Sequence, residues 1–134
     1  MPLAVASGWM LPAGVAALWG DWRGGLLVGG FTRIMLQSQS TMCVNSLAHW
    51  VGSQPYTRLV SAVDNFIVAL LTLGDGWHNF HHAFPTDFRC GIGPWKLDMT
   101  KWGIRFLAWA GSADDLVRTP EEVIAKVRLE TAAF

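Results

Sequence analysis

Hydrophobic and polar residues are unevenly distributed along this chain of 134 residues. Pro2 to Gly20 is a charge-free run of 19 residues, close to the ~20 that a helix needs to cross a hydrocarbon core about 30 Å thick. The short polar turn Asp21-Trp22-Arg23 follows, and a second apolar stretch runs from about Gly24 to Gly52. The pattern predicts a hairpin of two transmembrane helices, the first kinked at Pro12.

The second apolar stretch carries a single stripe of polar residues. Arg33, Gln37, Thr41, Asn45 and His49 each lie four residues after the last. Steps of four residues drift around a helix by about 40°, so these side chains share one slowly winding face. Within a membrane such a face must meet protein or a cavity, because exposure to lipid is costly. Hydrogen bonding between helices is the simplest role for Gln37 and Thr41.

Beyond residue 57 the hydrophobic pattern predicts three further helices. Arg58 to Leu73 has an apolar face interrupted by two polar residues, and we expect it to lie along the cytosolic membrane surface. Leu97 to Ala110 is amphipathic and is expected to pack against neighbouring protein or lipid headgroups. Glu121 to Leu129 reads as a surface helix, and Thr119-Pro120-Glu121-Glu122 predicts a capping box with proline at the first helical position.

Charge divides the chain in the same way. Only Asp21, Arg23 and Arg33 are charged among the first 57 residues, and the other 17 charged residues follow. The chain is 51% hydrophobic, with eight tryptophans, and only 15% charged, against roughly 25% in soluble domains. We therefore predict an all-α fold: an integral membrane helical hairpin over residues 1–57, then a cytosolic or interfacial helical cap over residues 58–134. The net charge of zero gives no reason to expect a nucleic-acid partner.

The two cysteines predict no disulfide. Cys43 lies in an apolar helix and Cys90 in a loop, without C-x-x-C spacing, which fits a reducing cytosol around the second region. The N-terminus lacks the basic segment of a signal peptide.

Three of the four histidines lie within the twelve residues from Gly74 to Pro85. Residues at positions i, i+3 and i+4 share one face of a helix, so His78, His81 and His82 can point toward a common centre. This is a spacing typical of metal ligands. Imidazole suits zinc, copper, iron and nickel, so the residues alone leave the metal open. The fourth histidine, His49, would by itself be as readily an ordinary core or surface residue.

Four motifs together indicate a family. Gly74 to Pro85 matches G-x-G-x-H-N-x-H-H-x-F-P position for position, and Asn45 to His49 matches N-S-x-x-H. Gly52 to Tyr56 resembles G-x-x-P-Y, and Trp95 to Thr100 resembles W-x-L-D-x-T. In these segments the sequence resembles the membrane-bound fatty acid desaturases, specifically bacterial members of the delta-9, stearoyl type. The resemblance covers essentially the whole chain.

The resemblance implies a non-haem di-iron centre (Fe2+/Fe3+) held by histidines. The implied ligands are His49, His78, His81 and His82. Asn45 would approach one iron through a water molecule, Trp77 and Asn79 would hold the imidazole rings in orientation, and Thr41 would lie near the bend of the acyl tunnel.

The reaction that the resemblance implies is the O2-dependent introduction of a cis double bond into a fatty acyl chain, at the delta-9 position. The substrate would be an acyl-CoA or an acyl-lipid, and ferredoxin or cytochrome b5 would supply electrons. The protein would be a multi-pass protein of the bacterial inner membrane with its histidine site on the cytosolic side.

The family has two earlier histidine boxes, H-x-x-x-x-H and H-x-x-H-H, and no histidine precedes His49 here. We therefore expect this chain to be the C-terminal half of a desaturase and to be inactive alone. Two alternatives stay open: a non-catalytic, desaturase-like membrane remnant, and a related di-iron lipid hydroxylase or sphingolipid desaturase. The N-S-x-x-H and W-x-L-D-x-T elements argue against the second alternative.

Overall fold

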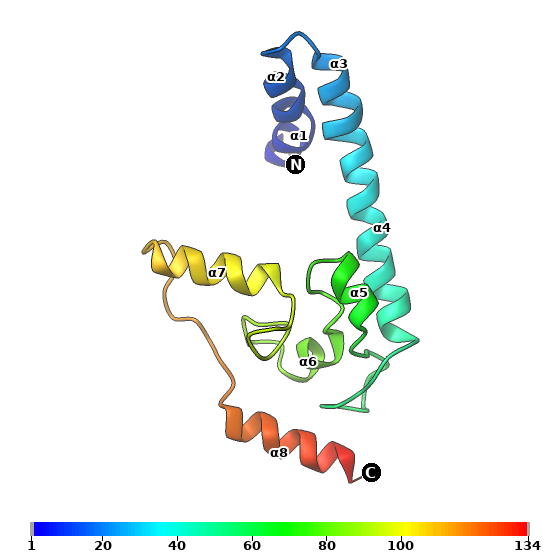
Figure 1. The fold of residues 1–134 in the computed structure, drawn as a ribbon, viewed down its shortest axis with the longest axis vertical. Coiled ribbons are helices and arrows are strands. Elements are labelled where there is room, and N and C mark those ends of the chain that lie inside the picture. The colour runs from blue at the N-terminus through cyan, green and yellow to red at the C-terminus, as the bar shows by residue number, and fades with distance from the viewer. Residues whose placement is uncertain (1, 134) are drawn as a thin grey trace. The chain divides into compact units, whose positions relative to one another are not determined.

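The computed structural model describes residues 2–133, and the chain divides after Thr41 into two compact units. Throughout these described residues the regular structure is helical, and the only β pairing is a pair of isolated bridges (Figure 1). The predicted all-α class is confirmed.

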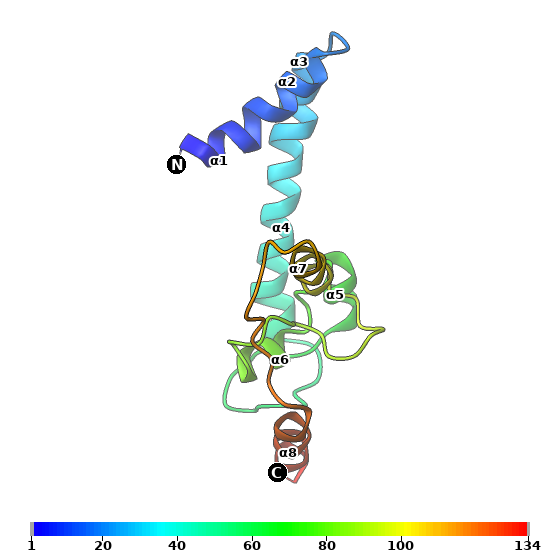
Figure 2. The ribbon, with the colours of Figure 1, turned by 90° about the vertical axis from the view of Figure 1, so that its left-hand side faces the viewer.

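The first unit contains two helical segments joined by a turn. The first segment comprises α1 (Pro2–Val5), the π-helix η1 (Ala6–Met10) and α2 (Leu11–Ala17). The second begins with α3 (Trp22–Gly24) and continues through the π-helix η2 (Gly25–Thr32) into α4 (Arg33–Ser46). Figure 2 shows the turn between them, where Gly20 has a φ of +88°. The two predicted helices are confirmed, and their placement in a membrane stays a prediction.

Within residues 2–133, no helix combines the length and the apolar character needed to cross a membrane.

Small residues let the two segments of the first unit approach closely. A Cβ atom on Gly25 would lie 2.5 Å from both the Ala16 Cβ and the Pro12 carbonyl oxygen, and one on Gly29 would lie 2.8 Å from the Pro12 Cβ. Glycines spaced four residues apart allow this backbone contact between helices. The two segments therefore pack through their backbones rather than through large side chains at these positions.

Arg33, the first residue of the polar stripe, contacts the helical turn that precedes Pro12. Proline has no N–H, so the carbonyl oxygen of Gly8, four residues earlier, loses its helical donor. The Arg33 guanidinium donates from Nη2 to this oxygen at 3.3 Å and from Nε to the Gly29 carbonyl at 2.9 Å. Arg33 thus gives the Gly8 carbonyl a donor in place of the α-helical N–H that proline lacks.

The second unit contains the end of α4 and the rest of the chain. The helix continues as the 3₁₀-helix η3 (Leu47–His49) and stops before the predicted end at Gly52. Four helices follow: α5 (Phe66–Leu71), α6 (His78–Ala83), α7 (Met99–Trp109) and α8 (Glu121–Ala132). The predicted helices at 97–110 and 121–129 are confirmed, with small differences at their ends.

The predicted helix from Arg58 to Leu73 is wrong over its first half, because residues 58–65 are not helical. The backbone of Asp64 forms isolated bridges with Ser53 and with Trp77, which hold this segment extended. The Asn65 side chain then accepts a hydrogen bond from the Val68 amide, so it caps a shorter α5.

The predicted capping box before α8 is also wrong. Pro120 is the N-cap residue, with a ψ of 140°, and no side chain caps the helix. The start of α8 is held instead by the buried Arg89, whose guanidinium pairs with Asp87 at 2.8 Å and with Glu121 at 2.9 Å. The Thr119 amide donates to the same Asp87 carboxylate.

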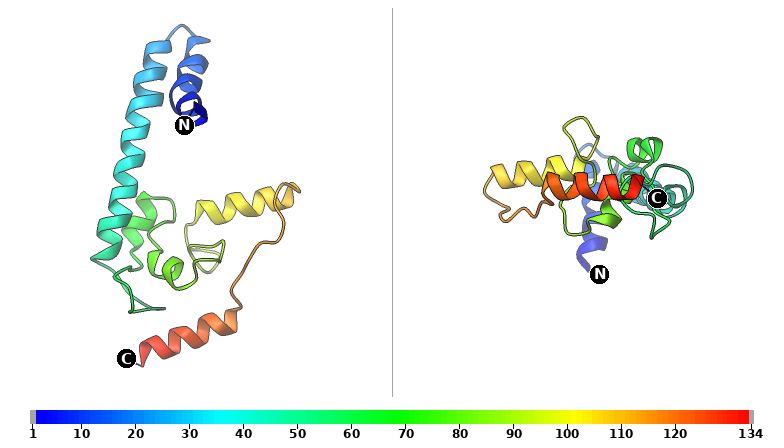
Figure 3. Two further views of the ribbon diagram at one scale, coloured as in Figure 1. Left: turned by 180° about the vertical axis from the view of Figure 1, so that it is seen from behind. Right: turned by 90° about the horizontal axis from the view of Figure 1, so that it is seen from below.

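Two small apolar clusters form the core of the second unit. Tyr56, Phe80, Phe84 and Ile124 make one, which packs α6 against α8, and Val44, Ala48 and Val68 make the other. An extended linker precedes α8, as Figures 1 and 3 show, and the helix is held by the packing of Ile124 and Val127 and by contacts at its two ends.

We expect Thr131→Val to loosen the C-terminal end of α8. Thr131 Oγ1 donates to the Tyr56 carbonyl oxygen at 3.0 Å, and a hydrogen bond of this kind contributes about 1 kcal/mol. Hydrogen exchange should become faster at the last turn of α8. Thr100→Val on α7 is the matched control, and equal exchange of α8 in the Thr131 variant and the parent would contradict the expectation.

Candidate metal centre

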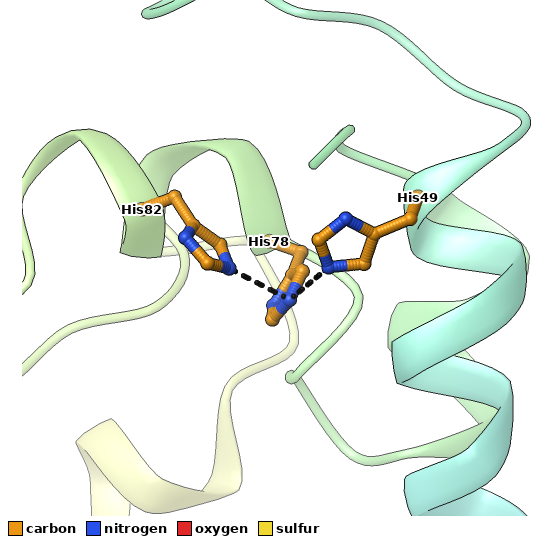
Figure 4. Close-up of side chains that lie close together, drawn as sticks. All are labelled: His49, His78 and His82. Carbon is orange, nitrogen blue, oxygen red and sulfur yellow. Dashed lines mark hydrogen bonds between the residues drawn. The ribbon is translucent and has the colours of Figure 1, made fainter. Parts of the chain in front are cut away.

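Three histidines from two separate elements converge in the second unit. His49 lies at the end of η3, and His78 and His82 lie on α6 (Figure 4). The His78 Nε2 atom is 3.0 Å from His49 Nε2 and 3.1 Å from His82 Nε2. One ligand nitrogen from each ring lies within 4.8 Å of the others. We call this group the histidine cluster.

The chemistry of the histidine cluster fits a cation. A ring nitrogen carries either one N–H or one lone pair, so His78 Nε2 can form one linear hydrogen bond but not two. Two close contacts to one nitrogen are accounted for when all three lone pairs face a metal ion. Burial, reinforced by the neighbouring histidines, lowers the pKa of His78 to about 4, so its ring is neutral near pH 7. Neutral imidazole is the form that binds iron and other transition metals.

His81 lies outside the histidine cluster. It is exposed, with its ring centroid 6.0 Å from that of His78 and 5.9 Å from that of His82. On a helix, residue i+4 returns to within 40° of residue i, whereas residues i+3 and i+4 differ by about 100°. The position of His49 on the His78 and His82 side therefore leaves His81 facing elsewhere, and its role as a ligand stays a prediction.

Asn79 anchors the box to the loop that precedes it. Its fully buried amide accepts hydrogen bonds from the Tyr56 and Thr57 amides and donates to the Thr57 and Ala62 carbonyl oxygens, at 2.8 to 3.2 Å. These four bonds fix the start of α6, which carries His78 and His82. Its predicted role in orienting the rings stays a prediction.

Asp64 supports the start of α6, a role that the sequence did not reveal. Its Oδ1 atom accepts hydrogen bonds from the Asn79 and Phe80 amides at 3.0 and 3.3 Å, so it satisfies donors in the first turn of α6. Burial raises the pKa of Asp64, against the opposing effects of the Lys96 ammonium at 3.4 Å and the two amides. The only signal in the sequence was a lone acid within an apolar run.

Trp77 packs against the segment that follows the box, and its predicted role in orienting the imidazole rings stays a prediction. Its indole N–H donates to the Leu97 carbonyl oxygen at 2.8 Å, and the Lys96 ammonium lies 3.9 Å from the ring centroid. Beside it, the buried Asp98 caps α7 through the Lys101 amide and also accepts from the Cys90 and Gly91 amides. The Trp95–Thr100 element thus supports the site structurally.

The two glycines of the box are required by the backbone. Gly74 has a φ of +135°, which strains any residue with a side chain. A Cβ atom on Gly76 would overlap the backbone of α5 at Ala69. These glycines bring the start of α6 close to α5 and thereby to His49.

The segment from Ser61 to Asp64 connects the two elements that carry the histidines. The Val63 amide donates to the Ala48 carbonyl oxygen at 2.8 Å, next to His49, and Ser61 Oγ lies 2.9 Å from His49 Nδ1. The other end of the segment holds α6 through Asp64. One short extended segment therefore sets the spacing between His49 and α6.

Two further predicted site residues lie on α4. Thr41 donates from Oγ1 to the Gln37 carbonyl oxygen at 3.1 Å and belongs to the first unit. Asn45 is exposed, one helical turn before His49, in the second unit. Their roles near the acyl tunnel and near an iron-bound water stay predictions. Cys43 and Cys90 are free thiols, as expected.

Comparison with known proteins gives relatives along most of this chain, although no family model matches. The chain is 42% identical over 127 residues to a probable acyl-CoA desaturase of Schizosaccharomyces pombe. The match covers 94% of this chain and 26% of the relative. It is 41% identical over 110 residues to acyl-CoA desaturase 1 of Saccharomyces cerevisiae, a match that covers 82% of this chain and 22% of the relative. It is 33% identical over 116 residues to stearoyl-CoA desaturase 5 of Bos taurus, a match that covers 85% of this chain and 34% of the relative.

These three relatives are eukaryotic, so the bacterial origin stays a prediction. The chain spans about a quarter of the length of the two yeast relatives. The four motifs, the convergence of His49 with His78 and His82, and the identity along most of the chain agree: this chain belongs to the fatty acid desaturase family.

Proposed function

We propose that this chain forms the histidine-box part of an acyl-CoA desaturase that introduces a cis double bond at delta-9. The observation that carries the proposal is the convergence of His49, His78 and His82 in a chain whose relatives are named acyl-CoA desaturases. His49, His78 and His82 would hold one iron of a di-iron centre, and the outward-facing His81 would serve the other.

Bound iron would activate O2 so that two hydrogens leave adjacent methylene groups, with two electrons and two protons from a donor system completing the reduction of O2 to water. The donor is proposed to be ferredoxin or cytochrome b5. The protein's own residues would orient the ligands: Asp64 and Asn79 fix α6, and Arg89 holds α8 beneath it. The chain is proposed to act in a membrane, with additional histidines from a segment that carries the two earlier boxes.

A chimera tests this proposal directly. The segment of the S. pombe relative that matches this chain would be replaced by it, and the chimera would be expressed in yeast that lacks its own acyl-CoA desaturase. We expect growth without added unsaturated fatty acid and new monounsaturated fatty acids by gas chromatography. The double-bond position in these products decides the delta-9 part of the proposal.

The matched control is the same chimera with His78→Ala. We expect it to accumulate in the membrane to the same level and to form no unsaturated product. An expressed, iron-loaded chimera without product, or one whose activity survives His78→Ala, would refute the assignment.

A further inference from the structure

The Ser61 hydroxyl faces the ring nitrogen of His49 that does not point into the histidine cluster. Ser61 Oγ lies 2.9 Å from His49 Nδ1, while His49 Nε2 lies 3.0 Å from His78 Nε2. The two nitrogens of one ring thus have separate partners. The hydrogen bond at Nδ1 decides which nitrogen carries the proton and which keeps a lone pair.

We propose that Ser61 is a positioning residue: its hydroxyl oxygen accepts the Nδ1–H of His49 and so keeps the Nε2 lone pair directed at the metal. The opposite arrangement, in which Ser61 donates to Nδ1, would put the proton on Nε2 and prevent His49 from binding metal there. Since free histidine favours the Nε2–H tautomer, the protein must supply an acceptor at Nδ1. Ser61 supplies it.

The backbone around Ser61 is well placed for this role. Ala62 and Val63 are buried, and the Val63 amide is bonded to the carbonyl of Ala48, the residue before His49. The Ala62 carbonyl accepts from the buried Asn79 amide of α6. The hydroxyl therefore reaches His49 from a segment that is fixed to both sides of the histidine cluster.

The Ser61 side chain itself is exposed, so its removal leaves no cavity in the core. Ser61→Ala removes only the acceptor, and Ser61→Thr restores it. A loss in the alanine variant that the threonine variant recovers would separate hydrogen bonding from general destabilisation.

The test measures the tautomer of His49 in the metal-free full chain in detergent micelles, by long-range 1H–15N NMR of 15N-histidine-labelled protein. The pH would be held well above the ordinary histidine pKa of about 6.5. A His49→Gln variant would show which NMR signals belong to His49. We expect Nδ1–H for His49 in the parent and in Ser61→Thr, and a shift toward Nε2–H in Ser61→Ala.

The second readout is Co2+ binding followed by its visible spectrum. Partners of this kind typically change metal affinity 10- to 100-fold, and we expect Ser61→Ala to weaken Co2+ binding about 10-fold, with recovery in Ser61→Thr. An Nε2–H tautomer in the parent, or an unchanged tautomer in Ser61→Ala, would overturn the inference.

The inference rests on the proposed function in one respect, because it assumes that the histidine cluster binds metal. The two failures are distinguishable. A parent chain with His49 in the Nδ1–H form that binds no Co2+ would overturn the metal-positioning role together with the proposed metal site. If the parent binds Co2+ and the tautomer of His49 is the same in the parent and in Ser61→Ala, the inference alone would be overturned.

Discussion

Replacing His78 with alanine is expected to abolish metal binding by the histidine cluster. His78 Nε2 is the central atom of the three, 3.0 Å from His49 and 3.1 Å from His82. Loss of an outer partner of a ligand already costs 10- to 100-fold in metal affinity, so loss of this ligand should cost more than about 100-fold. Anaerobic titration with Fe2+, followed by the iron content of the recovered protein, measures the change.

His81→Ala is the matched control, because it removes the same side chain from the same helix. His81 lies outside the group that shares a metal position, so its removal should leave one iron per chain bound with nearly the parent affinity. If His78→Ala and His81→Ala lose metal affinity equally, the metal is not bound by His49, His78 and His82 in preference to His81, and the assignment of the histidine cluster is wrong.

Asn79→Leu is expected to destabilise the second unit by about 4 kcal/mol. The change removes four hydrogen bonds at a fully buried position and leaves two amides and two carbonyl oxygens without this partner. A buried polar group that loses its partner costs about 1–3 kcal/mol, and only part of the four groups can regain solvent. Urea unfolding in detergent, followed by tryptophan fluorescence, gives the free energy of unfolding.

Gln54→Leu provides the comparison for Asn79. Its side-chain amide donates to the Val60 and Ala62 carbonyl oxygens from a half-buried position, so water can replace it. We expect a loss of about 1 kcal/mol. If the two leucine variants have the same free energy of unfolding, Asn79 is not the anchor of α6.

The helices were predictable where their signal is local. The apolar runs near 2–20 and 24–52 and the amphipathic pattern at 97–110 depend on residues close in sequence, and each appears as a helix. Residues 58–65 show a similar apolar pattern, but Asp64 pairs with Ser53 and Trp77, which are 11 and 13 residues away. Pairing with distant backbone overrides local periodicity, and a single sequence does not display it.

The candidate site was predictable to the level of its residue types. The histidine spacing and the motifs pointed to His49, His78, His81 and His82, while the selection of His78 and His82 depends on where His49 lies in space. Asp64 and Ser61 belong to no motif, and their partners are backbone amides, the Lys96 ammonium and one ring nitrogen. Such supporting contacts become visible only when the fold brings them together.

The Ser61–Asp64 connection also bears on the order in which the protein folds. The contacts that assemble the histidine cluster join residues 12 to 29 apart in sequence, whereas the hydrogen bonds that hold α8 join residues 32 apart (Arg89 and Glu121) and 75 apart (Thr131 and Tyr56). Each doubling of a loop costs roughly 0.6 kcal/mol in closure entropy, and short-range contacts form first. The histidine cluster should therefore become ordered before α8 docks. Pulsed hydrogen exchange during refolding would then protect the Asn79 amide before the amides of α8, and the reverse order would rule this sequence of events out.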